Sequence, residues 1–439
     1  MQIALVNSRI DPGGCTIRDA VCRLLEERRD WPLCRAADLL FHEVDGRLIH
    51  AQGVDRDLDC DCIFFLSRHA SHTRPVPTLT VHVTGNLDTA ELGGTDRTLP
   101  PAAPAWMQAI LRHLAGTAPP GYRVSYEVTH HGPTDLAIPS LFVEIGSTER
   151  EWQDEAAGMA VARSVLAAVP DPRTLPLIGF GGTHYAARQT AIATESRGAF
   201  GHMAPSRQVS GLDPEMVREM QRQSGAVAAY IDRKALDTAD LERIRRLLAD
   251  AGIPTVSEGE IGDMGTLCIE DYLALRELAR TRVPGSRMVV HALTGSGTPA
   301  AVQVPAELLE EACKRHPDEL LRALGDLPVA RLVGKGKACL PIFLTWERHR
   351  EQLINALISE CVQVLVTNGT AIAGDDRVII EDVRFDHQKA RALGVPEGPL
   401  FGELASGREV RLGDRSITPD MVRSVATKEI TIPGLERYL

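Results

Sequence analysis

Histidines recur along this sequence where strongly apolar stretches come to an end. Seven histidines between residues 69 and 202 form the candidate set, and they are His69, His72, His82, His130, His131, His184 and His202. In open α/β sheets, sites assemble at the carboxyl ends of strands, so we expect several of these side chains to share one rim of a sheet. Neutral imidazole binds zinc well and titrates near neutral pH. Such a cluster indicates metal-assisted or proton-transfer chemistry.

Glu144 interrupts the apolar stretch at residues 141–147, which predicts a strand. Side chains alternate along a strand, so Glu144 shares with Phe142 the face opposite to the other apolar residues. A carboxylate there is costly to bury unless it meets a cation, a metal or several hydrogen-bond donors. Taken alone, a glutamate on the solvated face of an edge strand is the favoured interpretation. The nearby histidines lead us to predict that Glu144 belongs to the site.

The adjacent residues His130 and His131 stand where a predicted strand breaks into a Gly-Pro turn. Neighbours on a regular strand face opposite sides, so both can reach one centre only if the turn twists them. Otherwise one of them supports the site or faces the substrate. A single histidine at a strand end is more often a hydrogen-bonded structural residue, and the compact H-E-x-x-H motif is absent. The pattern alone leaves open which histidines ligate and which transfer protons.

Residues 181–185 read Gly-Gly-Thr-His-Tyr directly after a predicted strand. The segment lacks both G-x-x-x-x-G-K-[ST] and G-x-G-x-x-G, so it is no standard phosphate loop. Paired glycines allow backbone N–H groups to approach a substrate oxyanion closely. A simple tight turn explains the same pattern equally well.

The elements that must position these residues alternate between strands and helices up to about residue 264. We predict an α/β fold, a three-layer sandwich around a mixed, mostly parallel sheet, for residues 1–264. A capping box at Thr148 begins a helix that extends to about residue 169. Strands are predicted at residues 2–8, 61–66, 79–86, 175–180 and 226–231.

Residues 265–439 predict a second, smaller α+β domain. Apolar residues at helical spacing indicate helices at residues 270–280, 306–316 and 346–361. Short apolar stretches indicate strands at residues 288–293, 362–367 and 378–380.

Composition limits the classes of function. The formal charge of −11 over 439 residues argues against broad nonspecific nucleic-acid binding, although a local basic patch could still recognise an RNA end. No stretch of about 18 apolar residues predicts a membrane span, and the N-terminus lacks a basic leader. Nine scattered cysteines without a C-x-x-C pair fit a reducing cytoplasm.

Several segments in order resemble the archaeal and plant type of D-aminoacyl-tRNA deacylase, also called D-tyrosyl-tRNA deacylase type 2. The resemblance covers roughly residues 1 to 255. It is carried by Phe65-Leu66-Ser67-Arg68-His69, Leu79-Thr80-Val81-His82 with Gly85-Asn86, Thr129-His130-His131-Gly132-Pro133, Glu144-Ile145-Gly146-Ser147-Thr148, Gly179-Phe180-Gly181-Gly182-Thr183-His184-Tyr185, Gly201-His202 and Tyr230-Ile231-Asp232-Arg233-Lys234. One local departure is Val83-Thr84 before Gly85-Asn86.

The resemblance implies hydrolysis of the ester that joins a D-amino acid to the tRNA 3′ end, with Zn2+ as cofactor and a monomeric state. It also implies a fold related to peptidyl-tRNA hydrolases and phosphorylases. On this basis we assign His130, His184 and Glu144 to catalysis. We expect metal binding or support from His69, His82, His131 and His202, and substrate contacts from Arg68, Asn86, Gly181, Gly182, Thr183 and Tyr185.

The remainder of the chain is an extension by comparison with many members of that family. Residues 389–402 resemble a segment of the tRNA 3′-processing endonucleases, but the H-x-H-x-D-H metal motif of those enzymes is missing. We interpret the extension as noncatalytic, either a tRNA-contacting or a packing module. Arg331, Lys335 and Lys337 are candidates for phosphate contacts, and a solvated loop is an equally good interpretation.

Two other functions compete with the deacylase hypothesis. A peptidyl-tRNA hydrolase or small-ester hydrolase would use the same scaffold and would differ in its preference for N-blocked substrates. A noncatalytic tRNA-binding protein would keep the histidines as structural residues, and would show neither bound metal nor turnover.

Overall fold

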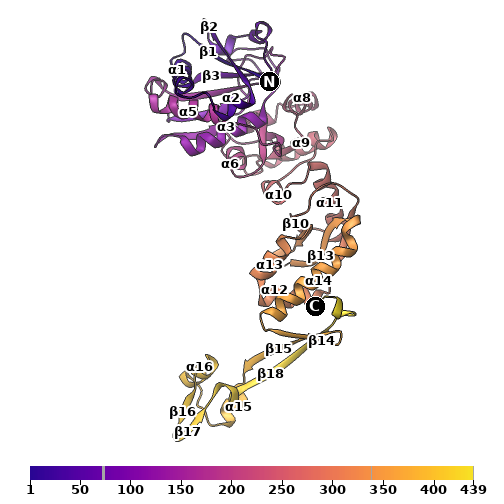
Figure 1. Ribbon diagram of the computed structural model, residues 1–439. Helices are drawn as coiled ribbons and strands as arrows, with labels where there is room; N and C mark the ends of the chain where they lie inside the picture. Colours follow the sequence, from indigo (N-terminus) through magenta and orange to yellow (C-terminus); the bar gives the residue numbers. More distant parts are fainter. Residues whose placement is uncertain (72–74, 338, 439) are drawn as a thin grey trace. The chain divides into compact units, whose positions relative to one another are not determined.

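The protein was analysed as a computed structural model, which describes residues 1–71, 75–337 and 339–438. The chain divides into two compact units, Met1–Gly262 and Asp263–Leu439. In Figure 1 the first unit runs from indigo to pink and the second from brown to yellow. Each unit has its own sheets and its own core, so each is considered by itself.

A six-stranded sheet organises the first unit. Its order is β2 (Asp38–Val44), β1 (Gln2–Ser8), β3 (Cys62–Ala70), β6 (Ser140–Ser147), β4 (Thr78–His82) and β5 (Arg123–Tyr126). All neighbouring strands are parallel except β4 and β6, which are antiparallel. The prediction of a mixed, mostly parallel sheet in an α/β fold is therefore confirmed.

The two faces of this sheet are covered differently. The helices α1 (Pro12–Glu27), α3 (Pro104–Thr117) and α5 (Glu155–Ala167) contact the sheet and pack against one another. The opposite face carries Phe65 and Phe142 and packs against Leu48, Val54 and Leu136 from loops and short 3-10 helices. Loop-covered sheet faces can hold an irregular cavity, because loops leave gaps that a regular helix would fill.

A smaller parallel sheet stands beside the first, in the order β8 (Gly198–Ala204), β7 (Leu175–Phe180) and β9 (Ala228–Ile231). The helices α8 (Pro214–Ser224) and α9 (Thr238–Asp250) bury apolar side chains against it. The chain that leaves β5 joins the two sheets, since Val128 N–H donates to His184 and Thr129 N–H donates to Met203. Residues 127–131 are therefore fixed between the sheets.

The second unit is built on antiparallel sheets. One has the order β10 (Arg287–Val290), β12 (Ala330–Val333), β13 (Cys339–Trp346) and β11 (Pro299–Gln303), and another the order β14 (Ala371–Gly374), β15 (Arg377–Phe385) and β18 (Arg423–Thr431). A short hairpin joins β16 (Val410–Leu412) to β17 (Arg415–Ile417). The helices are α11 (Ile269–Arg282), α12 (Ala306–Arg315), α13 (Pro317–Gly325), α14 (Arg350–Thr367), α15 (His387–Ala392) and α16 (Pro399–Ala405).

Several predicted elements differ from the structure. The strand predicted at residues 79–86 ends at His82 as β4, and the helix predicted from residue 346 begins at Arg350 as α14. The predicted strand at residues 362–367 is wrong, because these residues form the end of α14, where Val362 and Leu365 pack into the core at helical spacing. The helix predicted from Thr148 is divided into α4 (Glu149–Trp152) and α5. The break is at Asp154, whose side chain accepts from the N–H of Ala156 and begins α5 as a new helix.

Among the described residues, no helix is long and apolar enough to cross a membrane.

The contact between α1 and β3 depends on glycine. A Cβ atom added at Gly14 would overlap the carbonyl oxygen of Leu66. We expect Gly14→Ala to destabilise the first unit by about 1–3 kcal/mol, as overpacking of a rigid contact does. Gly116→Ala in α3 is the matched control, because a Cβ there meets nothing within 4 Å. Its effect should be a stabilisation of up to about 1 kcal/mol. Urea unfolding midpoints of the three proteins measure this, and a Gly14→Ala protein as stable as the parent would contradict the packing argument.

Candidate functional site

A cavity of about 580 Å³ opens on the loop-covered side of the six-stranded sheet. Its wall includes His69, His130, His131, Glu144 and His184, which are far apart in the sequence. These four histidines and one acid therefore lie in one cavity beside the sheet, as the sequence led us to expect.

Strand register places the residues of β3, β6 and β4. Glu144 lies in the middle of the three strands, opposite Ser67 on β3 and Thr80 on β4. His69 follows two residues after Ser67, near the end of β3, and His82 ends β4, where its ring stacks on Phe142. In the register of β6, His69 lies opposite Gly146 and His82 lies opposite Phe142, so the two histidines flank Glu144 from its two neighbouring strands.

His130 and His131 come from the segment between the two sheets, which is not a regular strand. The irregular backbone removes the alternation that would separate them, and their rings lie 4.4 Å apart between centroids. His82 is close to both, with ring centroids 4.9 Å from His130 and 4.7 Å from His131. The twist that the sequence left open is therefore present.

Glu127 is a member of this cluster that the sequence analysis missed. Its side chain is fully buried, with Oε1 3.0 Å from Nδ1 of His69 and Oε2 3.0 Å from Nε2 of His184. Nε2 of His130 lies 3.6 Å from the same Oε2. The available signal was an acid in the apolar stretch that leads directly to His130.

Glu144 occupies the other side of the cluster. Its Oε2 lies 3.7 Å from Nδ1 of His69 and 3.6 Å from Nε2 of His82. His69 thus stands between the two carboxylates, and its Nε2 is 3.0 Å from the hydroxyl of Tyr185. A buried carboxylate is tolerated where cationic or hydrogen-bonding groups surround it, and both acids have such surroundings.

Three imidazoles are oriented by backbone carbonyls. Nδ1 of His82 lies 3.0 Å from the carbonyl oxygen of Val83. Nδ1 of His130 and Nδ1 of His131 each lie 2.7 Å from a backbone carbonyl oxygen. An Nδ1–H that donates to a carbonyl leaves Nε2 as the lone-pair nitrogen. Metal-binding histidines are commonly oriented in this way, by donating the N–H of the nitrogen that does not bind the metal.

The buried charges shift pKa values in opposite directions within the cluster. Burial lowers the pKa of His69, but the charges and hydrogen bonds of Glu127 and Glu144 outweigh it and raise that pKa to about 11. Burial and the charge of His82 lower the pKa of His131 to about 4. Burial also lowers the pKa of His130 well below its usual range. His130 and His131 are therefore neutral at physiological pH, as metal ligands must be.

The donor set fits a divalent metal ion. Three groups have ligand atoms within 4.8 Å of one another, namely His82 with His130 and His131, His69 with Glu127 and His184, and His82 with Glu127 and Glu144. Three buried atoms of the cluster have no well-aligned hydrogen bond, namely Oε1 and Oε2 of Glu127 and Nε2 of His82. Imidazole or carboxylate atoms nevertheless lie near each of them. Buried polar atoms that converge without aligned partners are the expected surroundings of a cation.

Other predicted residues lie elsewhere. His202 is buried between Thr129 and the Pro100 carbonyl, at 3.2 and 2.9 Å, and joins none of the three groups. The amide of Asn86 donates to Gly93 and Thr95, which shapes a loop. His72 lies outside the described residues.

The Gly-Gly-Thr segment supports the site rather than lining the cavity. Gly181 and Gly182 have φ values of +96° and +97°, and the Gly182 N–H donates to Ser206. Thr183 donates to the carbonyl of Tyr185. The segment forms a tight turn that presents His184. Arg68 does line the cavity, and its guanidinium lies 4.8 Å from the ring centre of Trp152.

Residues 56–256 match a family model described as D-aminoacyl-tRNA deacylase. Proteins named D-aminoacyl-tRNA deacylase are similar over the full length of both chains. The one from Methanoculleus marisnigri is 52% identical over 439 residues, and that from Methanosphaerula palustris is 48% identical over 442 residues. A solved structure described as a conserved protein of unknown function is 30% identical with a TM-score of 0.54. It matches 59% of this chain and 96% of its own.

We expect the histidine cluster to bind a divalent metal ion, for which Co2+ is a spectroscopic probe. His130→Ala should weaken Co2+ binding by at least about 100-fold, because it removes a ligand rather than an outer-shell partner. The measurement is a titration of metal-free protein followed by visible absorption. The exposed His113 in α3 supplies the control His113→Gln, which should bind as the parent does. Equal Co2+ affinity in the His130→Ala protein would exclude His130 from the metal site.

Proposed function

The chain belongs to the D-aminoacyl-tRNA deacylase family, and from this premise we propose that its histidine–glutamate cavity hydrolyses the ester between a D-amino acid and the tRNA 3′ end. The observation that carries the proposal is the convergence of Glu144 and four imidazoles on the wall of one cavity, with the buried Glu127 in contact with three of those imidazoles. The reaction adds water to the acyl carbonyl and breaks its bond to the ribose oxygen. The products are a free D-amino acid and tRNA.

We assign general-base catalysis to His184. Its side chain is 33% exposed and lines the cavity, so water and substrate can reach it. The buried carboxylate of Glu127 holds its Nε2 at 3.0 Å, which fixes the ring and stabilises the imidazolium formed when His184 takes a proton from water. The same proton can then pass to the departing ribose oxygen.

His130 and Glu144 have supporting roles in this mechanism. Neutral His130 lies next to His184, with ring centroids 4.6 Å apart, so as a metal ligand through Nε2 it would place the metal beside the catalytic base. Glu144 holds His69 and His82 through contacts of 3.7 and 3.6 Å. His69 in turn contacts the Tyr185 hydroxyl, which can donate to the substrate.

We infer that the resident metal is Zn2+, held by His82, His130 and His131 with carboxylate help from Glu127 or Glu144. Zinc favours nitrogen ligands and a four-coordinate site, and the three imidazoles with one further position meet that need. Bound zinc supplies Lewis acidity for the carbonyl and lowers the pKa of water.

The rest of the cavity offers surfaces for the two parts of the substrate. Arg47 and Arg68 supply positive charge for phosphates of the tRNA end. Ile10, Ile49 and Leu92 supply an apolar wall on which the terminal base or the amino-acid side chain can pack. D- and L-aminoacyl esters carry the same polar groups. Selection must therefore come from steric exclusion of a side chain on the wrong side of the reacting carbon.

Finer features of the family remain proposals for this chain. We infer that the first unit is a three-layer sandwich related to the peptidyl-tRNA hydrolase and phosphorylase type, with helices as one outer layer and loops with short 3-10 helices as the other; the mostly parallel order of the sheet supports this relation. We also infer a monomer that acts in the cytoplasm, where aminoacyl-tRNA is used. The second unit is assigned a noncatalytic role, because all the proposed catalytic and metal-binding residues lie in the first.

A deacylation assay on matched D- and L-Tyr-tRNA tests the proposed function. The parent protein should hydrolyse D-Tyr-tRNA and leave L-Tyr-tRNA intact, and chelator treatment should abolish turnover. His184→Ala and Glu127→Gln should each lower kcat/KM by about 10²–10⁴, the usual contribution of acid–base catalysis. His113→Gln is the matched control and should keep the parent rate.

Three outcomes would count against the proposal. Faster hydrolysis of N-blocked aminoacyl-tRNA would indicate a peptidyl-tRNA hydrolase. Binding of tRNA without turnover or bound metal would indicate a noncatalytic binding protein. Parent rates in folded His184→Ala and Glu127→Gln proteins would remove these residues from the mechanism.

A further inference from the structure

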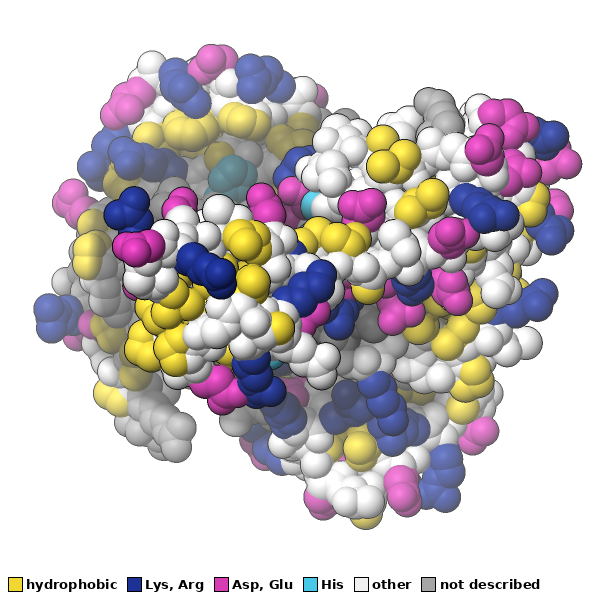
Figure 2. Space-filling view, turned by 90° about the horizontal axis from the view of Figure 1, so that it is seen from below, with side chains coloured by type: hydrophobic (Ala, Val, Ile, Leu, Met, Phe, Trp, Pro, Cys, Tyr) yellow, Lys and Arg dark blue, Asp and Glu magenta, His cyan; other side chains and the backbone are white. Residues whose placement is uncertain are grey.

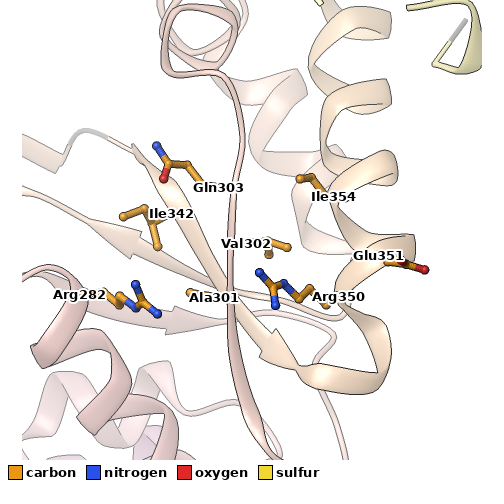
Figure 3. A pocket seen from close by; sticks show the side chains of 8 residues that line it. All are labelled: Arg282, Ala301, Val302, Gln303, Ile342, Arg350, Glu351 and Ile354. Carbon is orange, nitrogen blue, oxygen red and sulfur yellow. The ribbon is translucent and has the colours of Figure 1, made fainter. Parts of the chain in front are cut away.

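The second unit contains a cavity of its own, with a volume of about 480 Å³. Figure 3 shows it beside the edge strand β11, between the end of α11 and the start of α14. Its wall includes Arg282, Val302, Gln303, Ile342, Arg350 and Ile354, and we call it the arginine cavity. None of these residues is part of the proposed active site.

The two guanidinium groups of the arginine cavity have free hydrogen-bonding capacity. In Figure 3, Arg282 and Arg350 extend toward each other from opposite sides of Ala301. Within residues 1–71, 75–337 and 339–438, the side chain of Arg282 makes no ion pair or hydrogen bond. Arg350 lies 3.4 Å from Glu347, and both side chains are more than half exposed, so this pair is weak.

The one acid in the cavity wall does not neutralise these arginines. Figure 3 shows the Glu351 side chain directed away from both guanidinium groups. Two arginines without a close acid between them form a local concentration of positive charge. A planar guanidinium pair is well suited to phosphate oxygens, which accept two parallel hydrogen bonds from each group.

The remaining wall is apolar, with one amide. Val302, Ile342 and Ile354 line one part of the cavity, and Gln303 stands directly opposite Ile342 in the sheet register. A free phosphate ion would make no favourable contact with this apolar wall. A nucleotide presents a phosphate and a flat base together, and an amide can read the edge of that base.

We propose that the arginine cavity binds a phosphodiester and one unstacked nucleotide of the substrate tRNA. This inference rests on the proposed function, which brings an RNA polyanion to the protein. The formal charge of −11 opposes general attraction of RNA, and basic and acidic side chains are interspersed on the face drawn in Figure 2. Contact with RNA must therefore be local, and this cavity supplies two positive charges at one place, of which only Arg350 has an acidic partner, in the weak pair with Glu347. Nucleotides of loops and single strands can place a base outside the stack, as the cavity requires.

Binding of uncharged tRNA to the full-length protein tests the inference. The double variant Arg282→Gln/Arg350→Gln should bind fluorescent tRNA about 10-fold more weakly at about 0.1 M salt, because two phosphate contacts are lost. The plot of log affinity against log salt should become shallower by about 1.5. Fluorescence anisotropy across a salt series gives both quantities.

Two further variants separate this site from a general charge effect. Arg377→Gln removes the same charge from an exposed arginine that pairs with Glu429 at 2.9 Å, and it should bind tRNA as the parent does. Arg282→Lys/Arg350→Lys keeps the charges and loses the planar fork, so its affinity should lie between those of the parent and the double glutamine variant.

The outcomes distinguish this inference from the proposed function. Equal tRNA affinity and salt dependence in the parent and the double glutamine variant would overturn the inference. A loss of affinity for AMP with no change for tRNA would also overturn it, since it would indicate a site for a small nucleotide. A parent protein that binds tRNA through these arginines but hydrolyses no D-Tyr-tRNA would refute only the proposed function.

Discussion

Two carboxylates buried among imidazoles are the constraint on which the first unit depends. Glu127 and Glu144 are removed from water, and an isolated buried carboxylate would be strongly unfavourable. His69 lies between them, and the other rings surround them within 3.0 to 3.7 Å. The acids keep the cluster together, and the histidines make the burial of the acids possible. A metal ion on the same donor atoms would balance the negative charge further.

The fold satisfies this constraint by directing three separate segments to one place. The strand β3 places His69 two residues beyond the position opposite Glu144 of β6, and antiparallel β4 places His82 two residues to the other side of Glu144. The segment after β5 then crosses between the two sheets and is held there by hydrogen bonds from Val128 and Thr129. Because the sheet face above these residues is covered by loops, the cluster opens into a cavity that a substrate can enter.

Under the proposed function and the proposed tRNA contact, the two units divide the chemical problem that an aminoacyl-tRNA ester presents. The reacting bond is small and needs oriented acids, bases and a metal, which only a rigid interior can hold. The RNA is large and charged. Its phosphates need exposed cationic side chains that are not already held in strong ion pairs with acidic residues. The arginine cavity has this second character, with exposed guanidinium groups next to an apolar wall.

The sequence by itself determined many of the local elements and pointed to most of the side chains that we propose for the site. Apolar stretches predicted β1 and β7 at their observed bounds, because a buried strand leaves a continuous apolar signal. The histidines at strand ends and Glu144 within a strand were recognisable because reactive side chains are uncommon in such apolar stretches. The short apolar run at residues 362–367 was ambiguous between strand and helix, and packing in the core of the second unit decided for the helix.

Only the tertiary structure decided which of these residues meet. Glu127 gives only a weak sequence signal, an acid in the apolar stretch before His130, because a single acid at a strand end is usually solvated. Its burial depends on the second sheet that closes over it. His202 looks like the other histidines, yet its strand belongs to the smaller sheet, where its ring bonds to Thr129 and Pro100. Sequence spacing records order along the chain. Convergence in space depends on sheet register and on how the two sheets pack, which are long-range contacts that no local pattern contains.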